Sequence, residues 1–185
     1  GRRPAGRGGD ARSGALGDGA ADEGIFWEAV NYAVLRGLPV VFICENNRYA
    51  TYSHQLKRQP KDNISERVSA FGANTYTLFG NDVVGVYTAL KDAISHARAG
   101  RGPSFIEAYT YRWCSHVGPE DDSHIGYRPR EELEFWKTNC PIGLLEENMI
   151  SSGLLTPSLK ERLVFEIDGE IAKAFQFAKA SPFPN

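Results

Sequence analysis

The fold class of this chain follows from residues 17–47, GDGAADEGIFWEAVNYAVLRGLPVVFICENN. The stretch opens on a carboxylate, Asp18, among glycine and alanine, and it closes on an amide pair that ends with Asn47. Between these ends we predict one helix and one strand. In an open parallel sheet, this succession brings a carboxylate and an amide that are far apart in the sequence to the same edge of the sheet.

Apolar spacing defines the intervening helix and strand. Phe26 and Val30 belong to a set that recurs at helical spacing, and Gly37 is well placed to end that helix. Asp22 is expected to cap its start. The continuous apolar run over 40–44 then looks like a strand that is buried on both faces, as in a parallel sheet.

Strands and helices continue to alternate after this stretch. We predict strands over 76–79 and 104–109 and helices over 64–71 and 83–99. The alternation indicates an α/β protein with a parallel sheet flanked by helices. The expected core stripe of the helix over 83–99 includes Val83, Val86, Leu90 and Ile94.

Three segments lie outside this pattern. Residues 1–14 are rich in glycine and arginine and are expected to be disordered or non-native, which leaves 15–185 as the domain. Residues 113–130 form a long polar loop, a feature that is usually functional or mobile. The chain is expected to end in helices over 142–152 and 157–180. One face of the last helix carries Leu159, Leu163, Ile167, Ile171 and Phe175.

Composition limits the classes of function. The 185 residues are 42% hydrophobic and 24% charged with a formal net charge of −2, which is typical of a soluble globular protein and indicates no attraction to nucleic acid or membranes. No apolar run is long enough to span a bilayer, and no signal peptide is expected. The spacing of Cys44, Cys114 and Cys140 predicts neither disulfides nor zinc, which fits a cytoplasmic protein.

Hard oxygen ligands meet at the predicted sheet edge. Asp18, Asn47 and the backbone carbonyl of Tyr49 are the ligand types that Mg²⁺ prefers, with phosphate oxygens completing its shell. Small neighbours let a diphosphate approach the backbone: Gly17, Gly19, Ala20 and Ala21. Each half of the motif alone would be an ordinary turn. The spacing, with a helix and a strand between, favours a metal and diphosphate site.

This pattern resembles a known family. GDG followed by NN at this distance is the thiamine diphosphate motif. The whole stretch to Ala50 is similar to the alpha chain of the decarboxylating component of 2-oxo acid dehydrogenase complexes, of the pyruvate, branched-chain and acetoin types. The resemblance covers about residues 17–145. It continues through Gly80–Val83, Gly102–Glu107, Thr110–Trp113 and Tyr127–Glu132.

The resemblance implies a thiamine diphosphate-binding fold with a helical C-terminal region, and it implies roles for single residues. Asp18, Asn47 and the Tyr49 carbonyl would hold Mg²⁺, and the Gly17–Ala20 segment would contact the diphosphate. His116, four residues after Arg112, matches a loop histidine implicated in diphosphate binding and in acyl transfer. A histidine in a polar loop also titrates near neutral pH, although such a residue alone is more simply a solvated one.

The implied activity is oxidative decarboxylation of a 2-oxo acid with acyl transfer to a lipoyl partner. The implied partners are a beta chain in an α₂β₂ assembly, which supplies the activating glutamate, and a lipoyl-bearing acyltransferase. Two alternatives stay open. One is another thiamine diphosphate enzyme, a decarboxylase or ketol transferase, and the other is a non-catalytic assembly subunit or truncated remnant.

The chain also departs from the family. A hydrophobic strand should precede Gly17, but residues 10–16 are expected to supply two strand residues at most. The family's chain is about twice as long, so we expect a fragment or a damaged reading frame ahead of Leu16. Val117 replaces the serine that is phosphorylated in animal members, and Cys114 and Ser115 also differ from the common pattern.

Overall fold

The computed structural model describes residues 10–183 and divides the chain into two compact units, Gly1–Pro141 and Ile142–Asn185. The expectation of disorder over residues 1–9 lies outside the described residues. The first unit carries the sheet and the predicted site, and the second is helical. Each unit is described by itself below.

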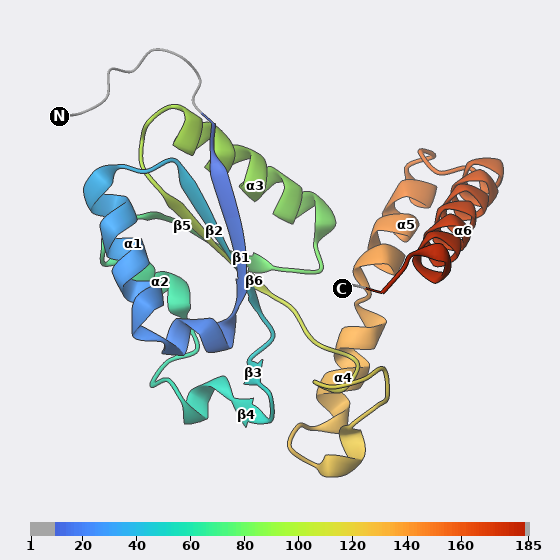
Figure 1. Cartoon of the computed structure of the whole chain (residues 1–185), viewed down its shortest axis with the longest axis horizontal. Coiled ribbons are helices and arrows are strands. Elements are labelled where there is room, and N and C mark those ends of the chain that lie inside the picture. Colours follow the sequence, from blue (N-terminus) through green and yellow to red (C-terminus); the bar gives the residue numbers. More distant parts are fainter. Residues whose placement is uncertain (1–9, 184–185) are drawn as a thin grey trace. The chain divides into compact units, whose positions relative to one another are not determined.

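A four-stranded parallel sheet forms the centre of the first unit (Figure 1). The strands lie in the order β1 (Arg12–Gly17), β2 (Val40–Asn46), β6 (Ser104–Tyr109) and β5 (Asn74–Phe79). Because all neighbouring pairs are parallel, the carboxyl ends of the four strands share one edge of the sheet. The predicted parallel α/β class is confirmed.

Strand β1 corrects the expectation that the residues before the GDG motif supply almost no strand. It has six residues and pairs with β2 from Arg12, opposite Val40, to Gly17, opposite Glu45. Part of the segment expected to be disordered therefore belongs to the sheet. The apolar pattern gave no sign of β1 because it is an outer strand of small and polar residues, held by backbone pairing, in which only Leu16 packs against the core cluster beside it.

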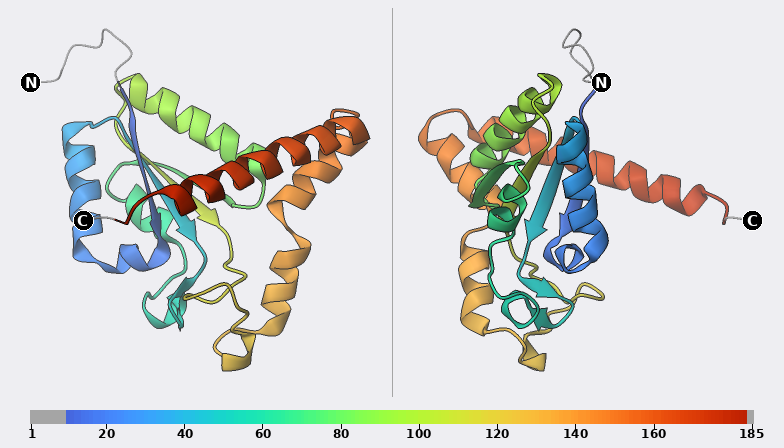
Figure 2. Two further views of the ribbon diagram at one scale, coloured as in Figure 1. Left: turned by 45° about the vertical axis from the view of Figure 1, so that its right-hand side comes forward. Right: turned by 90° about the vertical axis from the view of Figure 1, so that its left-hand side faces the viewer.

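Helices cover both faces of the sheet (Figures 1 and 2). On one face, α1 (Gly24–Arg36) and α2 (Ile64–Ser69) pack against β2 and β6. Their shared core contains Phe26, Val30, Cys44, Ile64, Val68 and Phe105. On the other face, α3 (Val83–Arg98) packs against the same strands. The two cores make the unit a three-layer structure with the sheet in the middle.

The packing face of α3 differs from the predicted stripe. Its buried residues are three alanines: Ala89, Ala93 and Ala97. Leu90 and Ile94 are only partly buried at the margin of this core, and Val83 is 40% exposed. Alanine lets the helix backbone approach the sheet closely, so the small residues face the strands and the larger ones flank them.

The ends of these helices test the two predicted end signals, Gly37 and Asp22, and show one further cap. Gly37 ends α1 in the left-handed conformation, with φ of 60°, as predicted. Asp82 caps α3 by accepting a hydrogen bond from Gly85 N at 3.0 Å. Asp22 does not cap α1, because the N-cap is Glu23, which makes no side-chain cap bond. Asp22 instead lies in a 3₁₀ turn, η1 (Asp18–Asp22).

A smaller aromatic cluster lies beyond the carboxyl edge of the sheet. Tyr49, in the short hairpin of β3 (Tyr49–Ala50) and β4 (Ser53–His54), packs with Tyr111 and with Leu133 of α4 (Arg130–Thr138). Trp136 stacks on Tyr111 with ring centroids 5.9 Å apart. Two 3₁₀ turns lie in the connections around this region: η2 (Gln55–Lys57), and η3 (Ser123–Ile125) within the loop predicted over 113–130.

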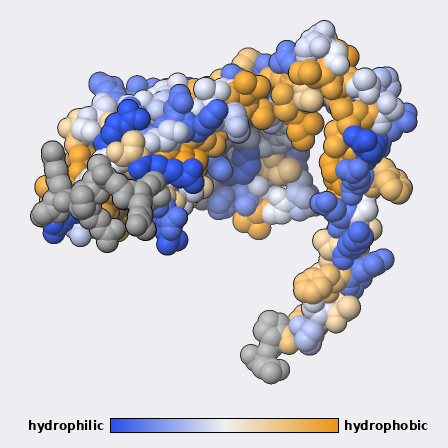
Figure 3. Space-filling model, turned by 90° about the horizontal axis from the view of Figure 1, so that it is seen from above, coloured by the Kyte–Doolittle hydropathy of each residue, from blue (hydrophilic) through white to orange (hydrophobic). Residues whose placement is uncertain are grey.

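The second unit contains α5 (Pro141–Ser151), apart from its first residue, and the long α6 (Pro157–Ala180), whose start is capped by Thr156. The apolar face predicted for α6 is present but exposed: Ile167 is 55% exposed and Phe175 is 64% exposed. Figure 3 shows hydrophobic and hydrophilic surface alternating along the helix that leads to the C-terminal end. Over residues 10–183, no helix combines the length and the apolar character needed to cross a membrane.

Candidate cofactor site

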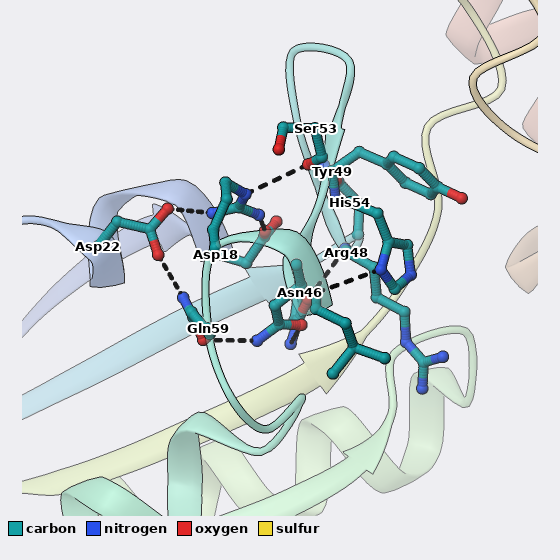
Figure 4. Close-up of polar contacts among 12 residues, drawn as sticks. Asp18, Asp22, Asn46, Arg48, Tyr49, Ser53, His54 and Gln59 are labelled. Carbon is teal, nitrogen blue, oxygen red and sulfur yellow. Dashed lines mark hydrogen bonds and ion pairs between the residues drawn. The ribbon is translucent and has the colours of Figure 1, made fainter.

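The predicted metal ligands follow neighbouring strands at the carboxyl edge of the sheet. Asp18 comes directly after β1, and Asn47 comes directly after β2, its parallel neighbour. The η1 turn that begins at Asp18 packs against both β2 and the β3 strand that begins at Tyr49. The fold therefore brings the three expected ligand positions to one edge, where Figure 4 shows Asp18 and Tyr49.

Glycine lets the η1 turn approach the hairpin. A Cβ atom at Gly19 would lie 3.0 Å from the Cβ of Ala50, tighter than side chains normally pack. A Cβ at Gly17 would meet nothing within 4 Å, so open space borders the backbone there. Gly17 and Ala20 are exposed, while Asp18 between them is buried. This combination leaves the backbone of Gly17 and Ala20 accessible to an anion next to a buried carboxylate.

Asp18 carries its charge in a buried position and has a cationic partner that the sequence did not indicate. Its side chain is 1% exposed, and its Oδ2 lies 2.5 Å from Nη2 of Arg58. The second terminal nitrogen, Nη1, pairs with Asp22, and Nε donates to the carbonyl of Ser53 at 3.2 Å. A buried carboxylate needs such compensation, because desolvation disfavours an unpaired charge. Arg58 lies in the connection between η2 and α2 and belongs to no motif.

The two asparagines of the NN pair have different roles. Asn46 is fully buried, and its amide donates to Glu107 Oε1 at 2.7 Å and to Gln55 Oε1 at 3.1 Å. The Asn47 side-chain oxygen accepts a hydrogen bond from Tyr49 N at 2.9 Å. Between them, Arg48 adopts a positive φ of 66°, which is uncommon for a residue other than glycine. Asn46 thus anchors the end of β2, while Asn47 shapes the turn that presents Tyr49.

A chain of hydrogen bonds connects the core to the site. From Asn46 it runs through Gln55 to Gln59, where Gln55 Nε2 donates to Gln59 Oε1 at 3.0 Å. Gln59 Nε2 then donates to Asp22 Oδ1 at 2.6 Å, a contact drawn in Figure 4. Gln55 and Gln59 are both buried. These glutamines hold the η2 segment, and with it Arg58, against η1.

Glu107 anchors the inner end of this chain. It is fully buried in β6, and its carboxylate accepts hydrogen bonds from Ser65 N at 2.8 Å and Ile64 N at 3.2 Å, the first backbone donors of α2. Burial raises the pKa of Tyr109 to about 12, and the nearby charge of Glu107 is the second cause of this rise. A glutamate in an otherwise apolar strand was the one sequence signal that could have revealed this anchor.

His116 reaches the same edge indirectly. The residue is exposed, and its Nδ1 lies 3.2 Å from Nη1 of Arg112. Arg112 Nη2 donates to the carbonyl of Thr51 at 3.2 Å, in the turn of the β3–β4 hairpin, and to the Tyr127 hydroxyl at 2.8 Å. The loop is therefore tied beside the hairpin that carries Tyr49. His116 itself contacts none of the three predicted metal ligands in the described contacts.

A buried ion pair holds the far end of that loop. Arg128 Nη2 lies 2.5 Å from Asp122 Oδ1, and the two side chains are 2% and 3% exposed. Burial acts to raise the pKa of Asp122, but hydrogen bonds from Tyr127 and Arg128 and the charge of Arg128 outweigh it and hold the pKa below the usual 3.8. The loop over 113–130 is therefore anchored at both ends rather than uniformly solvated.

The residues present fit a magnesium diphosphate group. The donor set contains one carboxylate, one amide and one carbonyl, and it leaves positions for phosphate oxygens and water. The accessible backbone at Gly17 and Ala20 suits the diphosphate. Among residues 10–183 there is no cluster of three or more histidine, cysteine, aspartate or glutamate side chains that could hold a metal ion.

The parallel sheet between helical layers, with polar groups gathered at its carboxyl edge, defines an α/β domain of the thiamine diphosphate-binding class. The chain belongs to the Dehydrogenase E1 component family, whose sequence model matches residues 11–185. This finding confirms the family that the motifs predicted.

Curated relatives support the same assignment. The chain is 36% identical over 168 residues to the 2-oxoisovalerate dehydrogenase subunit alpha of Bacillus subtilis, covering 91% of this chain and 50% of the relative. It is 31% identical over 170 residues to the pyruvate dehydrogenase E1 component subunit alpha of Porphyra purpurea, covering 92% and 48%. It is 33% identical over 171 residues to the corresponding subunit of Rhizobium meliloti, covering 92% and 48%. The chain thus spans about half the length of the curated relatives it matches.

Proposed function

We propose that this chain acts in the thiamine diphosphate- and Mg²⁺-dependent oxidative decarboxylation of a 2-oxo acid. It would do so as the alpha chain of a two-chain enzyme that passes the acyl group to a lipoyl partner. The observation that carries the proposal is the buried carboxylate of Asp18 at the carboxyl edge of the sheet, beside the strand that leads to Asn47. Membership of the Dehydrogenase E1 component family supports the reaction class.

The chain's own residues would bind and orient the cofactor. Asp18, Asn47 and the Tyr49 carbonyl would hold Mg²⁺, and the backbone from Gly17 to Ala20 would face the diphosphate. When bound, thiamine diphosphate supplies the nucleophilic carbon and the electron sink that decarboxylation needs. The Tyr49 hydroxyl donates to Glu132 Oε2 at 2.8 Å, which fixes the hairpin against α4 and so steadies the carbonyl ligand.

We assign His116 to the diphosphate and acyl-transfer side of the site. Its exposed ring lies on a loop that Arg112 ties to the hairpin carbonyl of Thr51. An exposed imidazole at that place can exchange a proton with a diphosphate oxygen or with an incoming thiol. Arg112, which contacts the His116 ring, would orient it.

The proposed partners are a beta chain, in an α₂β₂ assembly, and a lipoyl-bearing acyltransferase. The exposed apolar face of α6, with Ile167 and Phe175, supports a protein interface because such faces are usually covered. The cytoplasm is the proposed compartment, which the free cysteines Cys44, Cys114 and Cys140 support.

A titration of thiamine diphosphate tests the metal ligand. Binding would be measured with and without Mg²⁺, in the presence of the cognate beta chain, for the natural chain and for Asp18→Ala. We expect binding that depends on Mg²⁺ and that falls at least tenfold in the variant, which removes the only carboxylate ligand. Equal and negligible binding by both proteins would instead support a non-catalytic assembly subunit.

Strand β1 bears on the first of two alternative functions, the non-catalytic assembly subunit; the second is another thiamine diphosphate enzyme. A missing strand before Leu16 would favour a non-catalytic assembly subunit, but the six-residue strand β1 occupies that place. Another thiamine diphosphate enzyme, a decarboxylase or a ketol transferase, stays a candidate, and the loop that carries His116 favours the dehydrogenase.

A further inference from the structure

Arg58 lies between two carboxylates at the proposed metal site. Its Nη2 pairs with Asp18 Oδ2 at 2.5 Å, and its Nη1 pairs with Asp22 Oδ2. The arginine side chain is only 15% exposed. Every ion pair that Asp18 makes in the described part of the chain is to Arg58, so this guanidinium alone compensates the charge of the buried carboxylate.

The same carboxylate cannot serve both cations fully. A guanidinium at hydrogen-bond distance occupies Oδ2 of Asp18, and a divalent cation bound to that carboxylate would lie within a few ångströms of another positive charge. Coulomb repulsion at such separations is substantial, especially where burial lowers the effective dielectric constant. The metal and the guanidinium therefore compete for Asp18.

We propose that Arg58 is the resident counter-ion of Asp18, which a divalent cation must displace in order to bind. Metal entry and release of Arg58 from Asp18 then form a single exchange of cations at one carboxylate. The inference rests on the proposed function, because it requires Asp18 to be a metal ligand. It assigns a positioning role to a residue that belongs to neither the GDG nor the NN motif.

The surrounding contacts let the guanidinium leave without unfolding its segment. Gln55 and Gln59, which are buried on either side of Arg58, bond to each other at 3.0 Å, and Gln59 also bonds to Asp22 at 2.6 Å. Gln55 is held in turn by Asn46 at 3.1 Å. The backbone on both sides of Arg58 is thus anchored independently of the ion pair with Asp18. The arginine side chain is also held by Asp22 and by the Ser53 carbonyl, to which its Nε donates at 3.2 Å, so the exchange requires only its bond to Asp18 to break.

Mn²⁺ binding tests the competition directly. We would titrate the full 185-residue chain with Mn²⁺, following free Mn²⁺ by electron paramagnetic resonance, for the natural chain, Arg58→Gln and Asp18→Ala. Lys57→Gln is the matched control, because it removes one positive charge from the neighbouring, exposed residue, which makes no ion pair in the described structure. Loss of a competing cation should tighten binding by about tenfold, within the usual range for coupled sites.

The outcomes separate this inference from the proposed function. The exchange is supported if Arg58→Gln binds Mn²⁺ at least fivefold more tightly than the natural chain does. The Mn²⁺ affinity of Lys57→Gln should then equal that of the natural chain. Equal affinities for Arg58→Gln and the natural chain, with Asp18→Ala at least tenfold weaker, overturn the exchange and leave Asp18 as a metal ligand. If Asp18→Ala binds Mn²⁺ as tightly as the natural chain does, both the cation exchange and the role of Asp18 as a metal ligand are overturned.

A measurement on the natural chain covers the case in which Arg58→Gln does not fold. Phenylglyoxal modifies accessible arginines, and mass spectrometry reports the modification of each residue. We expect Arg58 to react several-fold faster after Mg²⁺ is added, because its guanidinium leaves Asp18. Arg36, exposed at the end of α1, should react equally in both conditions. Unchanged Arg58 reactivity at saturating Mg²⁺ contradicts the exchange.

Discussion

Glu107 shows how much of the site depends on a single buried residue. Its carboxylate accepts from Asn46, Ile64 and Ser65, so it joins the end of β2 to the start of α2. We predict that Glu107→Gln lowers the free energy of unfolding by about 1–3 kcal/mol, because the amide group turns one acceptor into a donor facing a backbone N–H. Urea denaturation measures this loss.

Glu45→Gln is the control for this prediction. Glu45 lies on β2, the strand that pairs with β6, but it is exposed, so removal of its charge should change stability by less than about 0.5 kcal/mol. Equal stabilities for both variants would show that the Glu107 carboxylate does not organise this region.

The two glycines around Asp18 form a natural pair for comparison. Gly19→Ala introduces a Cβ only 3.0 Å from Ala50 Cβ, so η1 or the hairpin must shift. We predict a loss of about 1 kcal/mol in unfolding free energy from this overpacking. Gly17→Ala meets nothing within 4 Å, so thermal unfolding should stay close to that of the natural chain. A stability loss confined to Gly17→Ala would contradict this account of the close approach.

His116 carries the prediction that separates the two half-reactions. In the assembled enzyme, His116→Ala should slow acylation of a lipoyl acceptor more than it slows decarboxylation, because the exposed loop ring is proposed to serve the transfer step. Stopped-flow decarboxylation and the rate of lipoyl acylation measure the two steps separately. Equal losses in both would place His116 in a role that is common to the two steps.

Among the elements, the 113–130 loop depends on the buried Asp122–Arg128 pair. The folded pKa of Asp122 lies below the usual 3.8, so its stabilising effect is present above that value and is lost as the pH falls through the folded pKa. Asp122→Asn should lower the unfolding free energy by about 3 kcal/mol at pH 7, because it leaves the Arg128 charge buried and unpaired. It should also reduce the loss of stability on acidification below about pH 4.

Denaturant titrations between pH 7 and pH 3 check this prediction. Asp92→Asn, at an exposed position on α3, is the comparison and should follow the natural chain across the whole range. If Asp122→Asn keeps the full acid dependence of the natural chain, then other carboxylates are responsible for it.

Among the elements, the sequence was most informative for strands whose side chains are buried on both faces of the sheet. The apolar runs that became β2 and β6 had strong patterns because both faces of these strands are covered. Strand β1 was missed because backbone pairing, rather than apolar burial, holds it. The buried face of α3 was misjudged because alanines pack there in place of larger residues.

The same reasoning explains what could be predicted of the site. Motif spacing identified Asp18 and Asn47, since both follow strand ends in a parallel sheet. Arg58 and Gln59 could not be identified, because their contacts with Asp18 and Asp22 join segments about 40 residues apart and depend on the path of an irregular loop. Long-range polar contacts of this kind leave no periodic signal in the sequence.

For the molecule as a whole, α6 carries a series of exposed apolar side chains, among them Ile167 and Phe175. We predict that Ile167→Glu combined with Phe175→Glu weakens association with the proposed beta chain at least tenfold. The two substitutions would place negative charges in an interface that the natural apolar side chains fill. Analytical ultracentrifugation of the mixed chains measures the effect. Lys173→Ser, at an exposed charged position on the same helix, is the control and should bind almost normally.

Strand β1 also has a consequence for the physical behaviour of the isolated polypeptide. It is one of the two outer strands of the sheet, so in the described structure one side of its backbone has no neighbouring strand, and nearly all its residues are exposed. Such a free border is a template onto which another copy can add. We therefore expect concentrated solutions of this chain to associate by β-pairing between native copies, unless another polypeptide covers that border.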